Sequence, residues 1–184
     1  MNDENENLKM RRTEVGKIAV EVSAEKALAV LWDIKSIECY EPKVDSALVI
    51  PGTQNKGTYF ARGRFAGIPW SGLFTYELNH HGFYSEMKRG AFGVKVQGGF
   101  VVTSESLDQC LITHYERYEF PSWLSPLSLF VRLYLHRAMK KELGNLVQLI
   151  HQTARPSITG EANKKLLSLI SAEQIPAEAN LNLF

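Results

Sequence analysis

A histidine and a glutamate two residues apart offer the clearest chemistry in this 184-residue chain. His114 and Glu116 lie in an alternating segment whose other members on the same side are Ile112, Tyr118 and Phe120. Side chains two residues apart on a strand point the same way, so the apolar neighbours place both polar groups on the inner face. The two residues are about 7 Å apart along a strand, so burial would require other partners or water.

Two interpretations of this pair remain open. In the first, this end of the strand lies near a mouth and the pair is solvated. In the second, the pair is the polar end of an apolar pocket, where His114 donates to a ligand carbonyl or moves a proton and Glu116 orients it. His114 and Glu116 are therefore the candidate catalytic residues, without catalysis being assigned to them.

Other chemical motifs lack the context that they need. His80 and His81 fall in the turn NHHG, and neither the histidines nor the cysteines have metal-ligand spacing, so no metal and no cofactor is predicted. The glycine-bearing stretches GRFAG and GVKVQGG lack the strand-then-helix context of a phosphate loop. No G-x-S-x-G motif occurs. Cys39 and Cys110 are expected to be free thiols in a reducing, cytoplasmic compartment.

The composition indicates one globular domain. The chain is 45% apolar and 22% charged with a formal net charge of +1, which favours no nucleic-acid partner. No apolar run approaches 18 residues, so no transmembrane helix is expected. Residues 1–14 are polar and predicted to be disordered, residues 15–154 form the domain, and residues 155–184 form a tail whose one amphipathic run, at 163–174, could be a short helix.

The elements that must position the pair follow from periodicity. KIAVEVSA alternates as a half-buried strand, a helix-like run ends at Pro42, and from Val44 onward short turns separate a series of antiparallel strands. After Pro126 the period becomes helical. An apolar stripe then runs along the chain through Val131, Leu135, Met139, Leu143, Leu146, Val147 and Ile150. A helix of this length spans roughly 39 Å, which suits one helix lying across a curved sheet.

The stretch VSAEKALAVLWDIKSIECYEPKVDSALVI resembles the opening of the START / Bet v 1-like (SRPBCC) superfamily, which includes polyketide cyclase/dehydratase-like proteins. Trp32, Pro42 and Val44 stand at the matching positions, and the element order is similar over residues 17–153. The resemblance implies an α+β helix-grip fold. In this fold a curved antiparallel sheet of six or seven strands wraps a long C-terminal helix, and two short helices follow the first strand. It also implies a hydrophobic tunnel beneath the helix and an inward-packed Trp32.

Large and very small residues alternate on the predicted inner face. Ala61, Gly63, Gly72, Ser85 and Gly98 either let the sheet bend and the helix approach, or leave space for a ligand. We favour the ligand cavity. Its predicted lining is Tyr59, Trp70, Phe74, Tyr76, Met87, Val96, Phe100, His114, Glu116, Tyr118 and Met139.

The predicted function is binding, or binding and transport, of an apolar or amphipathic small molecule such as a lipid, isoprenoid, quinone or polyketide. The resemblance also allows an enzyme of the cyclase/dehydratase kind acting on such a ligand. A third alternative is a protein-interaction module that uses the tail and a basic helix face. This face, made of Arg132, His136, Arg137, Lys140 and Lys141, is either solvated or a transient docking patch for an anionic partner or membrane surface.

Overall fold

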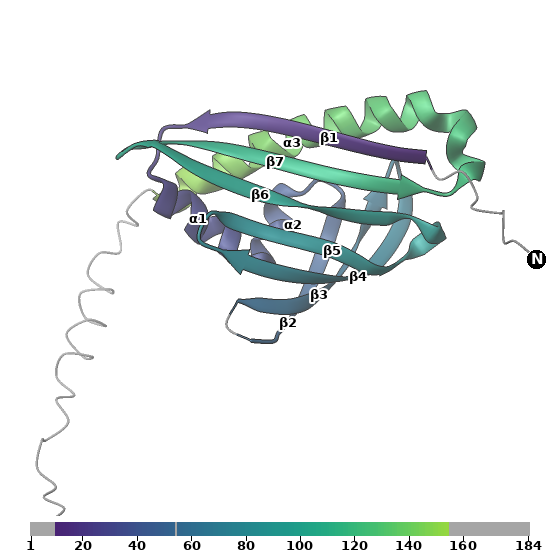
Figure 1. Cartoon of the computed structure of the whole chain (residues 1–184), viewed down its shortest axis with the longest axis horizontal. Coiled ribbons are helices and arrows are strands. Elements are labelled where there is room, and N and C mark those ends of the chain that lie inside the picture. The colour runs from purple at the N-terminus through teal and green to yellow at the C-terminus, as the bar shows by residue number, and fades with distance from the viewer. Residues whose placement is uncertain (1–9, 54, 155–184) are drawn as a thin grey trace, which may run out of the picture. The chain divides into compact units, whose positions relative to one another are not determined.

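A single antiparallel sheet dominates the structure, a computed structural model that describes residues 10–53 and 55–154. Its seven strands follow the order β1-β7-β6-β5-β4-β3-β2. They are β1 (Met10–Val20), β2 (Val44–Pro51), β3 (Lys56–Phe65), β4 (Ile68–Asn79), β5 (Gly82–Gly90), β6 (Lys95–Ser106) and β7 (Gln109–Phe120). Strands β2 to β7 form a meander, in which each strand pairs with the next one along the chain. The first strand, β1, pairs with the last, β7, at one edge of the sheet (Figure 1). Short turns dictate this antiparallel pairing.

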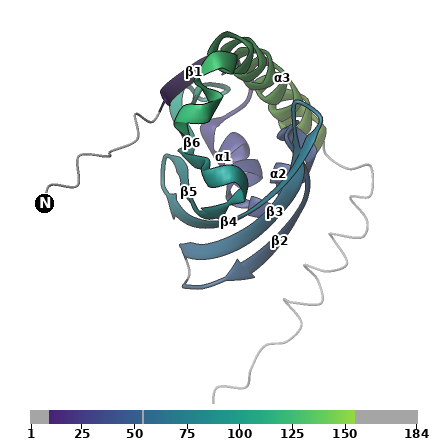
Figure 2. The same ribbon diagram turned by 90° about the vertical axis from the view of Figure 1, so that its right-hand side faces the viewer.

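A long helix, α3 (Ser128–Ala154), lies on the concave side of the curved sheet. Two short helices, α1 (Ala24–Trp32) and α2 (Ile37–Tyr40), are joined by the 3-10 turn η1 (Ile34–Ser36) and contact α3. Two further 3-10 turns, η2 (Ala91–Gly93) and η3 (Ser122–Leu127), lie at the opposite end of the sheet (Figure 2). The predicted fold class, a helix-grip arrangement with short helices after the first strand, is confirmed.

Periodicity places the inner faces as predicted. Along β7 every second residue from Cys110 to Phe120 is buried, so His114 and Glu116 do face inward. The stripe on α3 is also confirmed, because six of its seven residues are buried and Val147 is partly buried. No helix among the described residues is long and apolar enough to cross a membrane. Cys39 and Cys110 are both free thiols, one exposed and one buried.

Trp32 departs from the prediction. Its side chain is 42% exposed, and its indole N–H points to the β4–β5 turn, 3.1 Å from the carbonyl of Asn79 and 3.3 Å from that of Gly82. An indole buried at this position would lose a partner for its N–H. The expected inward packing is therefore wrong, and Trp32 instead fastens α1 to the turn.

Strand β1 begins at Met10, inside the segment 1–14 that was expected to be disordered. Residues 10–14 pair with residues 116–120 of β7, and this pairing satisfies their backbone groups. Residues 1–9 and the tail of residues 155–184, with its expected short helix, lie outside the described part of the chain.

Candidate functional site

A cavity of about 250 Å³ lies between the concave side of the sheet and α3. Nine of the eleven predicted lining residues do line it, namely Tyr59, Trp70, Phe74, Met87, Val96, Phe100, His114, Glu116 and Tyr118. Of the small residues, Ala61, Ser85 and Gly98 line it as well. Most of the remaining wall is aliphatic or aromatic. The apolar pocket that the large/small alternation favoured is thus present.

Tyr76 and Met139 do not reach the cavity. Met139 packs over Gly16 of β1, where an added Cβ would lie 3.1 Å from its Cγ. The hydroxyl of Tyr76 lies over Gly57, 2.6 Å from the position of an added Cβ. Both side chains pack against the hydrophobic core on the inner side of the sheet and not against the cavity.

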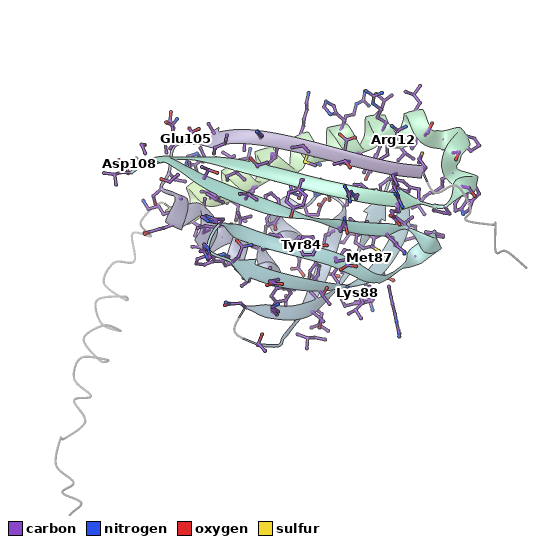
Figure 3. All side chains as sticks on the ribbon, viewed as in Figure 1. Arg12, Tyr84, Met87, Lys88, Glu105 and Asp108 are labelled. Carbon is purple, nitrogen blue, oxygen red and sulfur yellow. The ribbon has the colours of Figure 1, made fainter. Side chains whose placement is uncertain are left out.

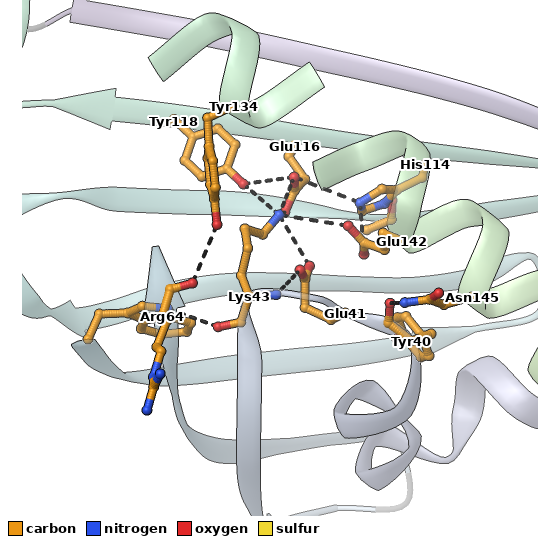
Figure 4. Close-up of polar contacts among 12 residues, drawn as sticks. Tyr40, Glu41, Lys43, Arg64, His114, Glu116, Tyr118, Tyr134, Glu142 and Asn145 are labelled. Carbon is orange, nitrogen blue, oxygen red and sulfur yellow. Dashed lines mark hydrogen bonds and ion pairs between the residues drawn. The ribbon is translucent and has the colours of Figure 1, made fainter. Parts of the chain in front are cut away.

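Six polar residues meet on one wall of the cavity and form what we call the buried polar cluster (Figure 4). They are Glu41 and Lys43 from the α2–β2 connection, His114, Glu116 and Tyr118 from β7, and Glu142 from α3. The charged members are all less than 9% exposed. The cluster therefore joins three separate elements of the fold beneath the helix.

Lys43 is the centre of the cluster. Its Nζ lies 3.1 and 3.0 Å from the two carboxylate oxygens of Glu116 and donates to the hydroxyl of Tyr118 at 3.0 Å. It also lies 3.2 Å from Oε2 of Glu41 and 3.7 Å from Oε2 of Glu142. Burial alone would lower the pKa of Lys43, but the neighbouring carboxylates, chiefly that of Glu116, outweigh burial and raise this pKa well above its usual value. Lys43 is thus a fixed positive charge.

His114 supplies the second positive charge. Its Nδ1–H donates to the carbonyl of Gly99 at 2.9 Å, and its Nε2 lies 3.2 Å from Oε1 of Glu142. Burial acts to lower the pKa of His114, yet the Glu142 carboxylate prevails and raises it. The imidazole ring also stacks on Phe100 at 3.9 Å between centroids, which fixes its plane. The solvated interpretation of His114 and Glu116 is wrong, because both side chains are buried and paired.

Two of the carboxyl groups in the cluster differ in their protonation. Burial and the neighbouring charge of Glu142 raise the pKa of Glu41 well above its usual range, so this group holds a proton. Burial acts to raise the pKa of Glu142 as well, but the charges of His114 and Lys43 outweigh burial and lower this pKa to about 2. With Glu41 neutral, Lys43 faces Glu116 at 3.0 Å and His114 faces Glu142 at 3.2 Å, so each of these two carboxyl groups has a basic partner. Such internal balance is what makes buried charge tolerable.

Local sequence explains how Lys43 comes to lie inside. Gly63 of β3 passes so close to this segment that an added Cβ would lie 1.8 Å from the Lys43 carbonyl oxygen. That carbonyl accepts a hydrogen bond from the indole N–H of Trp70 at 3.0 Å. The backbone N–H of Lys43 in turn donates to the Glu41 carboxyl at 2.9 Å. Only glycine permits the approach, so Gly63 and Trp70 together hold the lysine backbone against the sheet.

The cluster also contains a set of atoms with metal-ligand spacing. His114, Glu116 and Glu142 each offer one ligand atom within 4.8 Å of the others. The Lys43 ammonium already lies 3.0 Å from Glu116 and 3.7 Å from Glu142. A metal ion there would have to displace this ammonium, so we interpret the set as partners of Lys43.

Sequence analysis missed Glu41, Lys43 and Glu142. A signal existed for Glu142, since it lies three residues after Met139 and four before Leu146 and so falls on the apolar stripe of α3. A charged residue at such a position needs a buried partner. Glu41 and Lys43 flank Pro42 in a connection, where no periodicity reveals which side chains turn inward.

The chain matches no protein-family model and no curated protein by sequence. Solved structures do resemble it. The ZhuI aromatase/cyclase from Streptomyces sp. R1128 has a TM-score of 0.70 at 11% identity, over 82% of this chain and 99% of that one. A START superfamily protein from Mycobacterium smegmatis has a TM-score of 0.61 at 12% identity, over 74% and 98%. Norcoclaurine synthase from Thalictrum flavum has a TM-score of 0.58 at 14% identity, over 81% and 90%.

At these identities the likeness concerns the fold and not the chemistry. It agrees with the element order and with the sequence resemblance found in residues 17–153. The chain therefore has the helix-grip fold that START-like and Bet v 1-like (SRPBCC) proteins share.

Proposed function

We propose that the protein binds an amphipathic small molecule in the cavity beneath α3. The observation that carries this proposal is an apolar cavity with one polar wall, lined by the buried polar cluster. Its volume of about 250 Å³ lies just below the range of typical ligand sites, about 300 to 1,000 Å³, so a small ligand is expected. Apolar walls supply affinity through burial, and the polar wall selects orientation.

The charge balance of the cluster favours an uncharged ligand. Lys43 is surrounded by the oxygens of Glu116, Glu41 and Tyr118, so its ammonium protons already have partners. A ligand carboxylate or ammonium would upset a paired buried set, at a high desolvation cost. A hydroxyl or carbonyl group can instead exchange a hydrogen bond with the neutral carboxyl of Glu41. The preferred class is therefore an apolar ring or chain that bears neutral oxygen groups.

One observation favours a second candidate function, an enzyme acting on such a ligand. Glu41 lines the cavity and keeps its proton, while the charged His114 lies on the same wall. A buried carboxylic acid of raised pKa is suited to donating a proton to a reacting carbonyl or hydroxyl. Proteins of similar fold include an aromatase/cyclase, so a cyclisation or dehydration of a carbonyl-bearing chain is the reaction class to test.

Native mass spectrometry of the purified protein, followed by a dye titration, tests the binding proposal. We expect a co-purified neutral amphiphile that is released on denaturation. We also expect uptake of the uncharged fluorescent probe N-phenyl-1-naphthylamine. Val96→Trp places an indole in the cavity and should weaken dye binding at least about tenfold, because it occupies space that the ligand needs.

Val101→Trp is the matched control, since Val101 lies on the same strand with 40% of its surface exposed. This variant should bind the dye as the wild type does. Equal binding by wild type and Val96→Trp would contradict the proposal. The enzyme proposal predicts that the wild type turns over a carbonyl-bearing chain without a cosubstrate. If Glu41→Gln loses this turnover but still binds the dye, the result favours an enzyme over a protein that only binds its ligand.

A further inference from the structure

The mouth of the cavity is both apolar and exposed. Five side chains line the cavity and yet expose between 52% and 62% of their surface. We call them the mouth patch: Ile68 in the β3–β4 hairpin, Phe92 in η2, Trp123 and Leu127 in η3, and Phe130 at the start of α3. These elements gather at one end of the sheet (Figure 2). Water surrounds large apolar side chains here without any covering element of the described chain.

Backbone strain helps to build this patch. Phe92 has a φ of 59°, in the left-handed region that bulky residues rarely adopt, beside Gly93 at 70°. The result is an aromatic side chain held 57% exposed at the rim. Strain retained to keep an aromatic ring in water points to a use for the exposed ring.

The turn beside the patch is rich in basic residues. Lys88 pairs with Glu86 at 2.7 Å and Lys95 lies opposite Glu119 on β7, whereas Arg89 and Arg132 form no ion pair among the described residues. The turn around Phe92 alone carries Lys88, Arg89 and Lys95. Acidic residues such as Glu105 and Asp108 lie at the far end of the sheet, opposite Arg12 and Lys88 (Figure 3). A chain of net charge +1 thus carries a basic turn beside the mouth of the cavity.

We propose that the mouth patch docks on an anionic lipid bilayer. Exposed Trp, Phe and Leu side chains beside a basic turn are suited to the interface of such a membrane, where the rings enter and the cations meet lipid phosphates. The patch is continuous with the cavity, so docking opens the cavity directly onto the acyl region. An apolar ligand could then enter or leave without crossing water. Docking itself requires no ligand, and it is tested without one.

Flotation with lipid vesicles tests the docking. The protein should float with vesicles of 30 mol % phosphatidylserine in phosphatidylcholine and stay largely behind with pure phosphatidylcholine. Binding should weaken as salt is raised, because screening acts on the basic turn. The double variant Trp123→Ser/Phe130→Ser should lower the partition coefficient by about tenfold or more, since two large apolar side chains no longer enter the bilayer.

Matched controls separate docking from general surface effects. Val101→Ser/Leu107→Ser removes two exposed apolar side chains away from the mouth and should leave flotation unchanged. Arg89→Glu/Lys95→Glu should abolish anionic selectivity, whereas Lys26→Glu/Lys56→Glu should not. Circular dichroism confirms that each variant is folded.

Several results would overturn the proposal. These are flotation that ignores lipid charge, no flotation at all, or equal losses in the apolar variant and its control. Sedimentation velocity tests whether a second copy of the chain occupies the mouth patch instead. A dimer that Trp123→Ser disperses, in a protein that does not float, would assign the patch to a second copy of the chain. Each of these outcomes leaves the proposed ligand binding standing, because the dye titration measures that binding separately.

Discussion

Removing the charge of Lys43 is the most direct test of the role of this residue as the centre of the buried polar cluster. Lys43→Met keeps the length of the side chain and deletes its charge, leaving Glu116 buried without its main partner. Loss of one member of a buried ion pair typically costs about 3 to 5 kcal/mol. Protonating an ordinary glutamate at pH 7 costs about 3.7 kcal/mol, which limits the loss because the carboxyl can escape by taking a proton.

We therefore expect Lys43→Met to lower the free energy of unfolding by about 3 to 4 kcal/mol at pH 7. For a chain of this size that corresponds to a fall in Tm of roughly 6 to 16 °C. At pH 5 the same proton costs about 2.7 kcal/mol less, so most of the loss should disappear. Urea unfolding at the two pH values measures both quantities.

A double-mutant cycle completes the test. Glu116→Gln alone leaves Lys43 near Glu41 and Glu142, so we expect a smaller loss than that of Lys43→Met. The double variant should recover about 2 to 3 kcal/mol relative to the sum of the single losses. Lys56→Met is the control, since Lys56 forms an exposed pair with Glu77 at 3.0 Å that contributes about 1 kcal/mol or less. Additive single losses, or a loss independent of pH, would refute the central role of Lys43.

Two further predictions concern the neighbours of Lys43. The folded-state pKa of Glu41 is raised above the unfolded value near 4.5, so its stabilising effect is complete below that pH and is lost as pH rises through the folded pKa. Glu41→Gln mimics the protonated form, so the free energy of unfolding in urea should fall less steeply with rising pH in this variant than in the wild type. The same dependence on pH above pH 5 in both proteins would contradict this. Gly63→Ala should cost about 1 to 3 kcal/mol or more, because its Cβ would meet the Lys43 carbonyl at 1.8 Å. Gly144→Ala is the control, since an added Cβ has open space there and should stabilise α3; a Gly63→Ala melting curve like that of the control would show that the loop does not need this approach.

Periodicity accounts for the part of the site that could be predicted. His114 and Glu116 were placed inside because alternation along β7 survives folding, and the stripe of α3 was read correctly for the same reason. Glu41 and Lys43 could not be found this way. Their inward position depends on Gly63, some twenty residues away in sequence, and such long-range approach leaves no local pattern. Burial of His114 and Glu116 implied that both side chains have polar partners, but the sequence did not show which residues these partners are.

The prediction for Trp32 was wrong for a different reason, because it applied the average burial of tryptophan to one particular side chain. Tryptophan is mostly buried on average, but this indole lies next to the carbonyls of Asn79 and Gly82 at a turn and donates its N–H to them. The hydrogen bonds of the Trp32 indole at the edge of the fold therefore keep this side chain partly exposed. Residue type alone could not show this, because the β4–β5 turn reaches α1 only once the sheet has curved.

Stability alone gives little reason to keep five ionisable side chains beside an apolar cavity. Replacing a buried ion pair by apolar groups of similar size is often neutral or stabilising, so natural retention of the pair points to use. The double variant Lys43→Met/Glu116→Gln separates the two explanations. If the double variant is folded by circular dichroism but loses its preference for a neutral oxygen-bearing amphiphile in native mass spectrometry, the cluster serves recognition. If it retains that preference, the cluster only joins α3, β7 and the α2–β2 connection, and the polar wall must be removed from the proposed site.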